Sequence, residues 1–95
     1  MSEQERLYSE LERAESARQL LANKLLQGAI ADLRARYIGD IEKAGGKDET
    51  WLAKERLAAL NKVVRDLEQH VTTGKLARSR LDELARLFKT PGSRP

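Results

Sequence analysis

The chain has 95 residues, enough for one domain at most. Its 40% share of hydrophobic residues is too high for a wholly disordered chain, and its 35% share of charged residues exceeds the ~25% of an ordinary globular domain. Since no cysteine is present, disulfides and thiolate metal sites are excluded, and since both prolines lie in the last five positions, an all-α fold is predicted.

No early basic-then-apolar stretch marks a signal peptide, and no apolar run approaches the ~20 residues of a membrane span. We therefore expect a chain without membrane contacts, located in the cytoplasm.

The net charge of +3 is unevenly spread. Residues 1–15 carry five Glu against two Arg, whereas residues 75–95 carry six Lys or Arg against one Asp and one Glu. An acidic N-terminal segment and a basic C-terminal segment favour antiparallel or head-to-tail contacts between copies. The alternative is that both segments are simply solvated helix surface without a partner. Nucleic acid fits this distribution less well, because it would favour one broad basic face.

The first predicted helix spans residues 3–22. Its amphipathic stripe falls at spacings of three and four, with Arg18 as a charged interruption. The stripe consists of Leu7, Leu11, Ala14, Arg18 and Leu21. Asn23 either continues this helix or acts as the N-cap of a second one, in which Gly28 is interpreted as a site of close helix approach.

The clearest break is "KAGGKDET", residues 43–50, where Gly45 and Gly46 free the backbone and Asp48 is the predicted N-cap. A long helix is expected over residues 49–73. Its apolar residues alternate strictly at spacings of three and four: Ala53, Leu57, Leu60, Val64, Leu67 and Val71.

"TTGK" at residues 72–75 is not a phosphate-binding loop, because such a loop reads GxxxxGK[ST] and follows a strand, whereas position 69 is Gln and position 76 is Leu. Gly74 is interpreted instead as a helix terminator, followed by a last helix over residues 75–89. Residues 91–95 are expected to form a flexible tail.

Together these elements predict a single helical domain, residues 1–90. Two long arms, 3–43 and 48–89, would form a helical hairpin around the loop 43–50. Each arm would be divided once at most, giving up to four helices in a small bundle or an oligomeric, coiled-coil-like assembly.

No catalytic residue, metal site or cofactor is predicted, because His70 has no nucleophile in a recognisable arrangement and the carboxylates form i,i+4 ladders with arginine. The protein-contact candidates are the stripe Leu7, Leu11, Ala14, Arg18 and Leu21, together with Trp51, for which core packing is the alternative. The nucleic-acid candidates, for an alternative function, are Lys75, Arg78 and Arg80. A helix-turn-helix is disfavoured because only "KTPGSRP" follows "LDELARLF".

"ARQLLANKLLQGAIADLRARYIGDIEKA" and "ERLAALNKVVRDLEQHVTTGKLARSRLDEL" resemble short helical proteins encoded by tailed bacteriophages near head and packaging genes. The shared elements are Leu-Leu-x-Asn, the pair Tyr37–Ile38 and a Gly-Lys-Leu-Ala turn at residues 74–77, within about residues 17–85. Such proteins often have Pro after the Asn, where Lys24 stands here.

The resemblance implies a non-enzymatic viral protein that acts by protein contacts in particle assembly, packaging or the virion, in the cytoplasm of a bacterial host. Its expected partners are further copies of itself, another phage protein or a host protein. Two alternatives stay open: a nucleic-acid-binding module that uses the basic C-terminal arm, and a phage inhibitor of a host defence protein.

Overall fold

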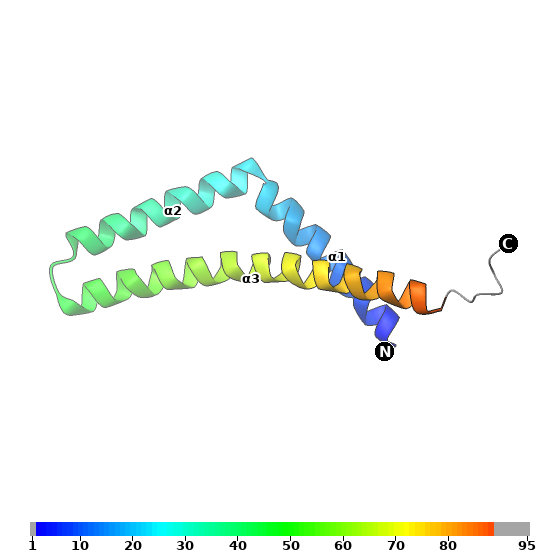
Figure 1. Cartoon of the computed structure of the whole chain (residues 1–95). Helices are drawn as coiled ribbons and strands as arrows, with labels where there is room; N and C mark the ends of the chain where they lie inside the picture. The colour runs from blue at the N-terminus through cyan, green and yellow to red at the C-terminus, as the bar shows by residue number, and fades with distance from the viewer. Residues whose placement is uncertain (1, 89–95) are drawn as a thin grey trace.

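A computed structural model describes residues 2–88, and it confirms the predicted all-α class. Three helices follow one another: α1 (Glu3–Ala22), α2 (Lys24–Lys43) and α3 (Lys47–Leu87) (Figure 1). The described range contains no strand. The predicted tail at 91–95 and the predicted end of the second arm at residue 89 lie outside the described residues.

Two side-chain caps set where the two helices of the first arm begin. The backbone N–H of Glu5 donates to Ser2 Oγ (3.1 Å), so Ser2 caps α1. At the break inside the arm, the backbone N–H of Leu26 donates to Asn23 Oδ1 (2.9 Å), so Asn23 caps α2. Asn23 itself is extended (φ −71°, ψ 118°), and the arm changes direction there (Figure 1). Of the two interpretations of Asn23, the N-cap is therefore the observed one.

The Asn23 cap leads to a stability prediction. We expect Asn23→Ala to lower the free energy of unfolding by about 1 kcal/mol, because one N–H in the first turn of α2 loses its acceptor. Asn23→Asp keeps an oxygen acceptor and should lower the free energy of unfolding by only a few tenths of a kcal/mol. Urea denaturation of both variants measures the difference, and an equal loss in both would contradict a capping role.

The predicted break around the double glycine is present but shorter than expected, covering only residues 44–46. Gly46, with an extended backbone (φ −158°, ψ 172°), is the N-cap of α3, so the prediction of Asp48 as N-cap is wrong. Asp48 and Glu49 lie in the first turn, where the Glu49 carboxylate accepts a hydrogen bond from the backbone N–H of Gly45 (3.1 Å). Because this carboxylate reaches back to the loop, α3 can begin before Asp48.

The predicted helix end at Gly74 is also wrong. α3 runs without interruption for 41 residues, about 62 Å, and no residue in the described range has a positive φ. The second arm is therefore undivided, and three helices form instead of four. Gly74 is buried in the middle of α3 against α1. Its role is to let two helices approach, and α3 continues past it.

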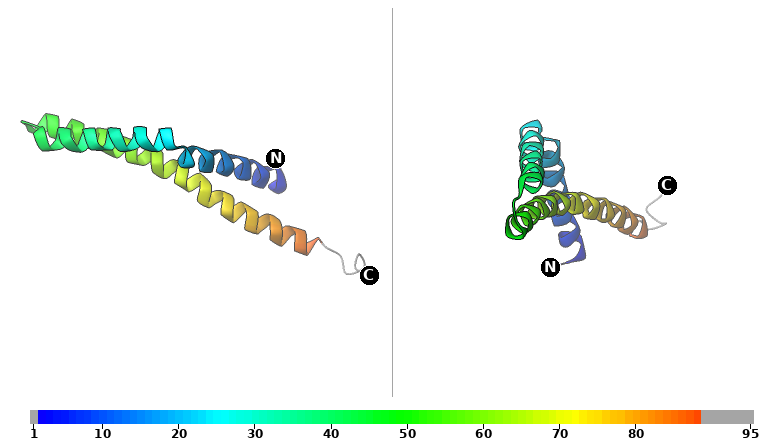
Figure 2. Two further views of the ribbon diagram at one scale, coloured as in Figure 1. Left: turned by 90° about the horizontal axis from the view of Figure 1, so that it is seen from above. Right: turned by 90° about the vertical axis from the view of Figure 1, so that its left-hand side faces the viewer.

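The three helices make an elongated molecule. α2 runs back along the first half of α3, and α1 turns at Asn23 and crosses the second half (Figures 1 and 2). The extents are 74 × 26 × 18 Å and the radius of gyration is 20.7 Å, against about 12 Å for a compact chain of this length. The core is correspondingly small and lies at the α1–α3 crossing, where Leu7, Ala77, Leu81 and Leu84 are buried together.

The close helix approach predicted at Gly28 occurs at Gly74 instead. A Cβ built on Gly28 would meet no atom within 4 Å. A Cβ built on Gly74 would overlap the Cβ of Ala14 and would lie 3.6 Å from its Cα. The crossing therefore depends on the absence of a side chain at Gly74.

Candidate protein-contact surface

The crossing of α1 and α3 is built from small residues in the middle and larger ones toward the chain ends. Ala14 meets Gly74, while Leu7 joins the cluster of Leu81 and Leu84. Small residues allow two helix backbones to approach closely, and the leucines then bury their side chains beside that contact.

The apolar stripe of α3 explains why α1 crosses instead of continuing the line of α2. Along most of α3 the stripe alternates spacings of three and four, which keeps a seam facing one partner. From Val71 to Gly74 to Ala77, two spacings of three follow each other. Such a three-residue discontinuity moves the seam sideways around the helix, and the buried residues beyond it face α1.

The structure divides the predicted contact stripe of α1. Leu7 is buried, Leu11, Ala14 and Leu21 are half-buried, and Arg18 is exposed. The residue that faces α3 in the place expected for Arg18 is Ala17, which is buried. The signal was in the sequence, because Ala17 follows Ala14 by three and precedes Leu21 by four, continuing the helical spacing.

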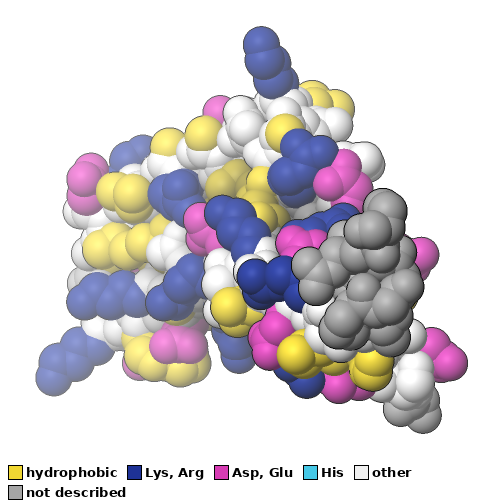
Figure 3. Space-filling view, turned by 45° about the vertical axis from the view of Figure 1, so that its right-hand side comes forward, with side chains coloured by type: hydrophobic (Ala, Val, Ile, Leu, Met, Phe, Trp, Pro, Cys, Tyr) yellow, Lys and Arg dark blue, Asp and Glu magenta, His cyan; other side chains and the backbone are white. Residues whose placement is uncertain are grey.

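Beside the crossing lies a shallow groove of about 480 Å³, called here the crossing groove. Apolar and small residues from both helices line its floor: Leu11, Ala14, Val71 and Gly74. Charged residues line its rim: Glu15, Arg18, Lys75 and Arg78. The fold thus brings three predicted protein-contact residues together with two of the three nucleic-acid candidates. Figure 3 shows one face of the molecule, on which basic side chains gather beside acidic and apolar ones.

Two of the three basic rim residues keep an unneutralised charge. Arg18 donates two hydrogen bonds to Glu15, from Nε (3.0 Å) and from a terminal nitrogen (2.5 Å). This pair lowers the pKa of the Glu15 carboxyl and raises the pKa of Arg18. Neither Lys75 nor Arg78 forms an ion pair with any residue between 2 and 88. The groove therefore presents a net positive rim over an apolar floor.

Arg80, the third nucleic-acid candidate, lies outside the groove and is engaged by carboxylates. Its Nε donates to Glu3 Oε1 (2.7 Å), and a terminal nitrogen donates to Glu83 Oε1 (3.0 Å). The contact with Glu3 joins the start of α1 to the last part of α3. The hydrogen bond from Arg80 lowers the pKa of the Glu3 carboxyl below its ordinary value of 4.5.

The lowered pKa of Glu3 leads to a pH prediction. Because the folded-state pKa lies below the unfolded one, the stabilisation is complete above about pH 4.5 and is lost as the pH falls through the lowered value. We expect the melting temperature of the natural chain to fall slightly more between pH 7 and about pH 3 than that of Glu3→Gln. The effect is small because the pair is exposed, and salt should reduce it further.

Thermal melts at several pH values, at low and high salt, measure this difference. Glu55→Gln is the matched control, since Glu55 is exposed on α3 and no ion pair to it occurs in the described part of the chain. Identical pH profiles for Glu3→Gln and Glu55→Gln would show that the contact with Arg80 contributes nothing.

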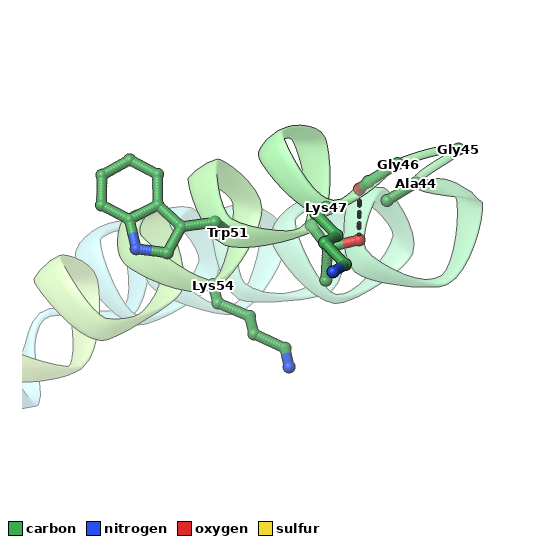
Figure 4. Close-up of a pocket in the computed structure, with 7 residues that line it drawn as sticks. Ala44, Gly45, Gly46, Lys47, Trp51 and Lys54 are labelled. Atoms are coloured by element: carbon green, nitrogen blue, oxygen red, sulfur yellow. Dashed lines mark hydrogen bonds between the residues drawn. The ribbon is translucent and has the colours of Figure 1, made fainter.

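Trp51 lies at the far end of the molecule, near the turn between α2 and α3, and it does not pack in the core. Its side chain is 64% exposed and borders a shallow pocket with Gly46, Lys47, Thr50 and Lys54 (Figure 4). Phe88, at the other end of α3, is also exposed. The alternative interpretation of Trp51 as a core residue is therefore wrong.

The single histidine of the chain lies beside a carboxylate of the same helix. His70 Nε2 lies 3.6 Å from Asp66 Oδ2 on the outside of α3. Between residues 2 and 88, no three side chains of the metal-binding types gather in a possible metal site. In the same range, none of the helices combines the length and the apolar character needed to cross a membrane.

No protein-family model matches the chain. Neither a curated protein nor a solved structure matches it either.

Proposed function

We propose that this chain is a non-enzymatic helical protein that acts through protein–protein contacts and associates with copies of itself. Its two arms would form a hairpin whose apolar seam is completed by neighbouring copies in a small helical bundle. Following the resemblance to helical proteins of tailed bacteriophages, we place its action in particle assembly, packaging or the virion.

The observation that carries this proposal is the amount of exposed surface. The chain exposes 7552 Å², whereas a compact monomer of 10.7 kDa exposes about 5,500 Å². The excess is roughly 2,000 Å² per chain. If two copies each buried half of that excess, the interface would cover about 2,000 Å² in total, the upper end of the standard size for specific complexes.

The distribution of burial supports the same proposal. α2 has no buried residue, although it carries an apolar stripe along α3. In the half of the molecule formed by α2 and the beginning of α3, Ala53 is the one buried hydrophobic residue among those described. Two helices cover only one side of each other, so this half needs another surface to complete a core.

Light scattering combined with size-exclusion chromatography over a range of concentrations tests the proposal. We expect a mass of at least twice 10.7 kDa, with dissociation on dilution. A monomer that melts cooperatively and stays monomeric up to roughly 1 mM would contradict it, because association at such concentrations corresponds to only ~4 kcal/mol.

A nucleic-acid-binding module is a second candidate, supported by Lys75 and Arg78 in the crossing groove, which have no ion-pair partner among residues 2–88. It is weaker because Arg80 is already held by Glu3 and Glu83. Titration with duplex DNA at two salt concentrations tests it. Affinity that falls steeply with salt and is lost in Lys75→Ala/Arg78→Ala would support this candidate over self-association through the groove.

A further inference from the structure

The outer surface of α1 carries a second charged feature, opposite in sign to the crossing groove. Glu5, Tyr8 and Glu12 follow each other at spacings of three and four, so they lie on one face of α1. All three are exposed, and the Tyr8 side chain is 58% exposed. None of the ion pairs formed within the described part of the chain involves Glu5 or Glu12. We call these three residues the acidic face.

The acidic face and the crossing groove are complementary. On the acidic face, two carboxylates without an ion-pair partner among the described residues flank the Tyr8 side chain. In the crossing groove, two cations that likewise have none there, Lys75 and Arg78, flank an apolar floor. Tyrosine is a frequent anchor of interfaces, because its ring buries apolar area while its hydroxyl stays hydrogen-bonded. Complementary charges at the rim then select the partner and its orientation.

We propose that the crossing groove of one copy binds the acidic face of a second copy, so that two α1 helices pair antiparallel in a symmetric dimer. This inference rests on the proposed self-association and names one surface through which copies would associate, at the α1–α3 crossing, in addition to the exposed seam of α2 and α3. A two-fold axis requires the same patch on both copies. The crossing groove and the acidic face both lie on α1, with Leu11 on the groove side and Glu12 on the acidic face. Each copy can therefore contribute its acidic face to the groove of the other copy.

The sequence of α1 fits an antiparallel pairing. If the two-fold axis passes between Leu11 and Glu12, residue 5 of one copy lies level with residue 18 of the other. Glu5 then faces the partner's Arg18, and the partner's Glu5 faces Arg18 in return. Tyr8 of each copy comes level with Glu15 on the rim of the groove, near Lys75 and Arg78. The pairing thus brings Glu5 level with the partner's Arg18 and Tyr8 near the partner's Lys75 and Arg78, on both sides of the axis.

Charge reversal with complementation tests the dimer. One variant is Glu5→Lys/Glu12→Lys and the other is Lys75→Glu/Arg78→Glu. The four changed residues are exposed, so both variants should keep the fold, which circular dichroism verifies. We expect each variant alone to associate about tenfold or more weakly than the natural chain, because like charges then meet across the axis. Mixed one to one, they should form a heterodimer in which both contacts again pair opposite charges.

Native mass spectrometry measures the heterodimer directly, because the two variants differ in mass. The control for total charge is Lys62→Glu/Arg65→Glu, an equal reversal at exposed positions of α3 outside the groove. It should associate as the natural chain does. Tyr8→Ala should weaken the dimer without changing the net charge, which separates the anchor from the charges.

Each other outcome overturns this inference in a distinguishable way. If the natural chain associates and neither reversed pair weakens it, the interface lies elsewhere and the proposed self-association stands. If the natural chain remains a monomer at roughly 1 mM, both the inference and the proposed self-association fail. If the natural chain is monomeric and its Lys75 and Arg78 bind a synthetic acidic amphipathic peptide or duplex DNA, the crossing groove binds that ligand and not a second copy.

Discussion

Gly74→Ala should destabilise the protein, although the same substitution in an exposed helix is stabilising. A Cβ at this position would overlap the Cβ of Ala14, so α1 and α3 would have to move apart at their closest contact. Overpacking of this kind costs about 1–3 kcal/mol. The gain in helix propensity, up to ~1 kcal/mol, offsets part of that cost. We expect a net decrease in the free energy of unfolding, measured by urea denaturation at a fixed chain concentration.

The chain provides matched controls for this prediction. Gly28 and Gly39 lie within α2, and a Cβ on either would meet no atom within 4 Å. Gly28→Ala and Gly39→Ala should therefore raise the free energy of unfolding by about 0.5–1 kcal/mol each. The double variant Ala14→Gly/Gly74→Ala removes the overlap and should regain part of the loss. If Gly74→Ala stabilised the protein as the controls do, the close crossing would be contradicted.

The boundaries of the first arm could be predicted because they depend on local chemistry. Asn23 supplies a side-chain acceptor, and the double glycine supplies a permissive loop. Both effects act within a few residues of the sequence, so no knowledge of tertiary contacts was required. The break between the arms is shorter than predicted, and its N-cap is Gly46 instead of Asp48, because two capping options lie only two positions apart in the chain.

The continuity of α3 could not be read from Gly74 alone. A glycine after a long apolar stripe fits a helix terminator and a helix-crossing site equally well. The deciding feature is Ala14 on α1, 60 positions away in the sequence, and its position opposite Gly74 depends on the angle at Asn23. What the sequence does contain is a stripe that continues at helical spacing beyond Gly74 through Ala77, Leu81 and Leu84, which is compatible with one uninterrupted helix.

The sequence predicts the residues of the crossing groove as two separate sets. Leu11, Ala14 and Arg18 were identified on one helix, and Lys75 and Arg78 on another, with different functions assigned to the two sets. Their meeting in the crossing groove depends on how α1 is positioned along α3, which a single sequence does not specify. The uneven charge is visible in the sequence, and part of it is satisfied within the chain by the ion pair of Glu3 and Arg80.

Leu81→Ala should be strongly destabilising, because Leu81 is one of two buried leucines of α3 in the described core cluster. Leu81 is 8% exposed and belongs to the small core cluster with Leu7, Ala77 and Leu84. Truncating a buried leucine to alanine costs about 2–5 kcal/mol, because transfer energy is lost and a cavity remains. Small proteins have only ~5–15 kcal/mol of stability in total. Since this cluster holds α1 on α3, we expect α1 to detach first, seen as early hydrogen exchange of its amides.

Leu76→Ala is the matched control, five residues earlier on the same helix. Leu76 is 66% exposed, and truncating it should change the free energy of unfolding by no more than about 0.5 kcal/mol. Comparable losses at the two positions would place the core elsewhere or would show that Leu76 is covered in an assembly. Dilution separates these two cases, because a contribution from an intermolecular contact weakens as the chain dissociates, whereas the contribution of Leu81 inside one chain does not.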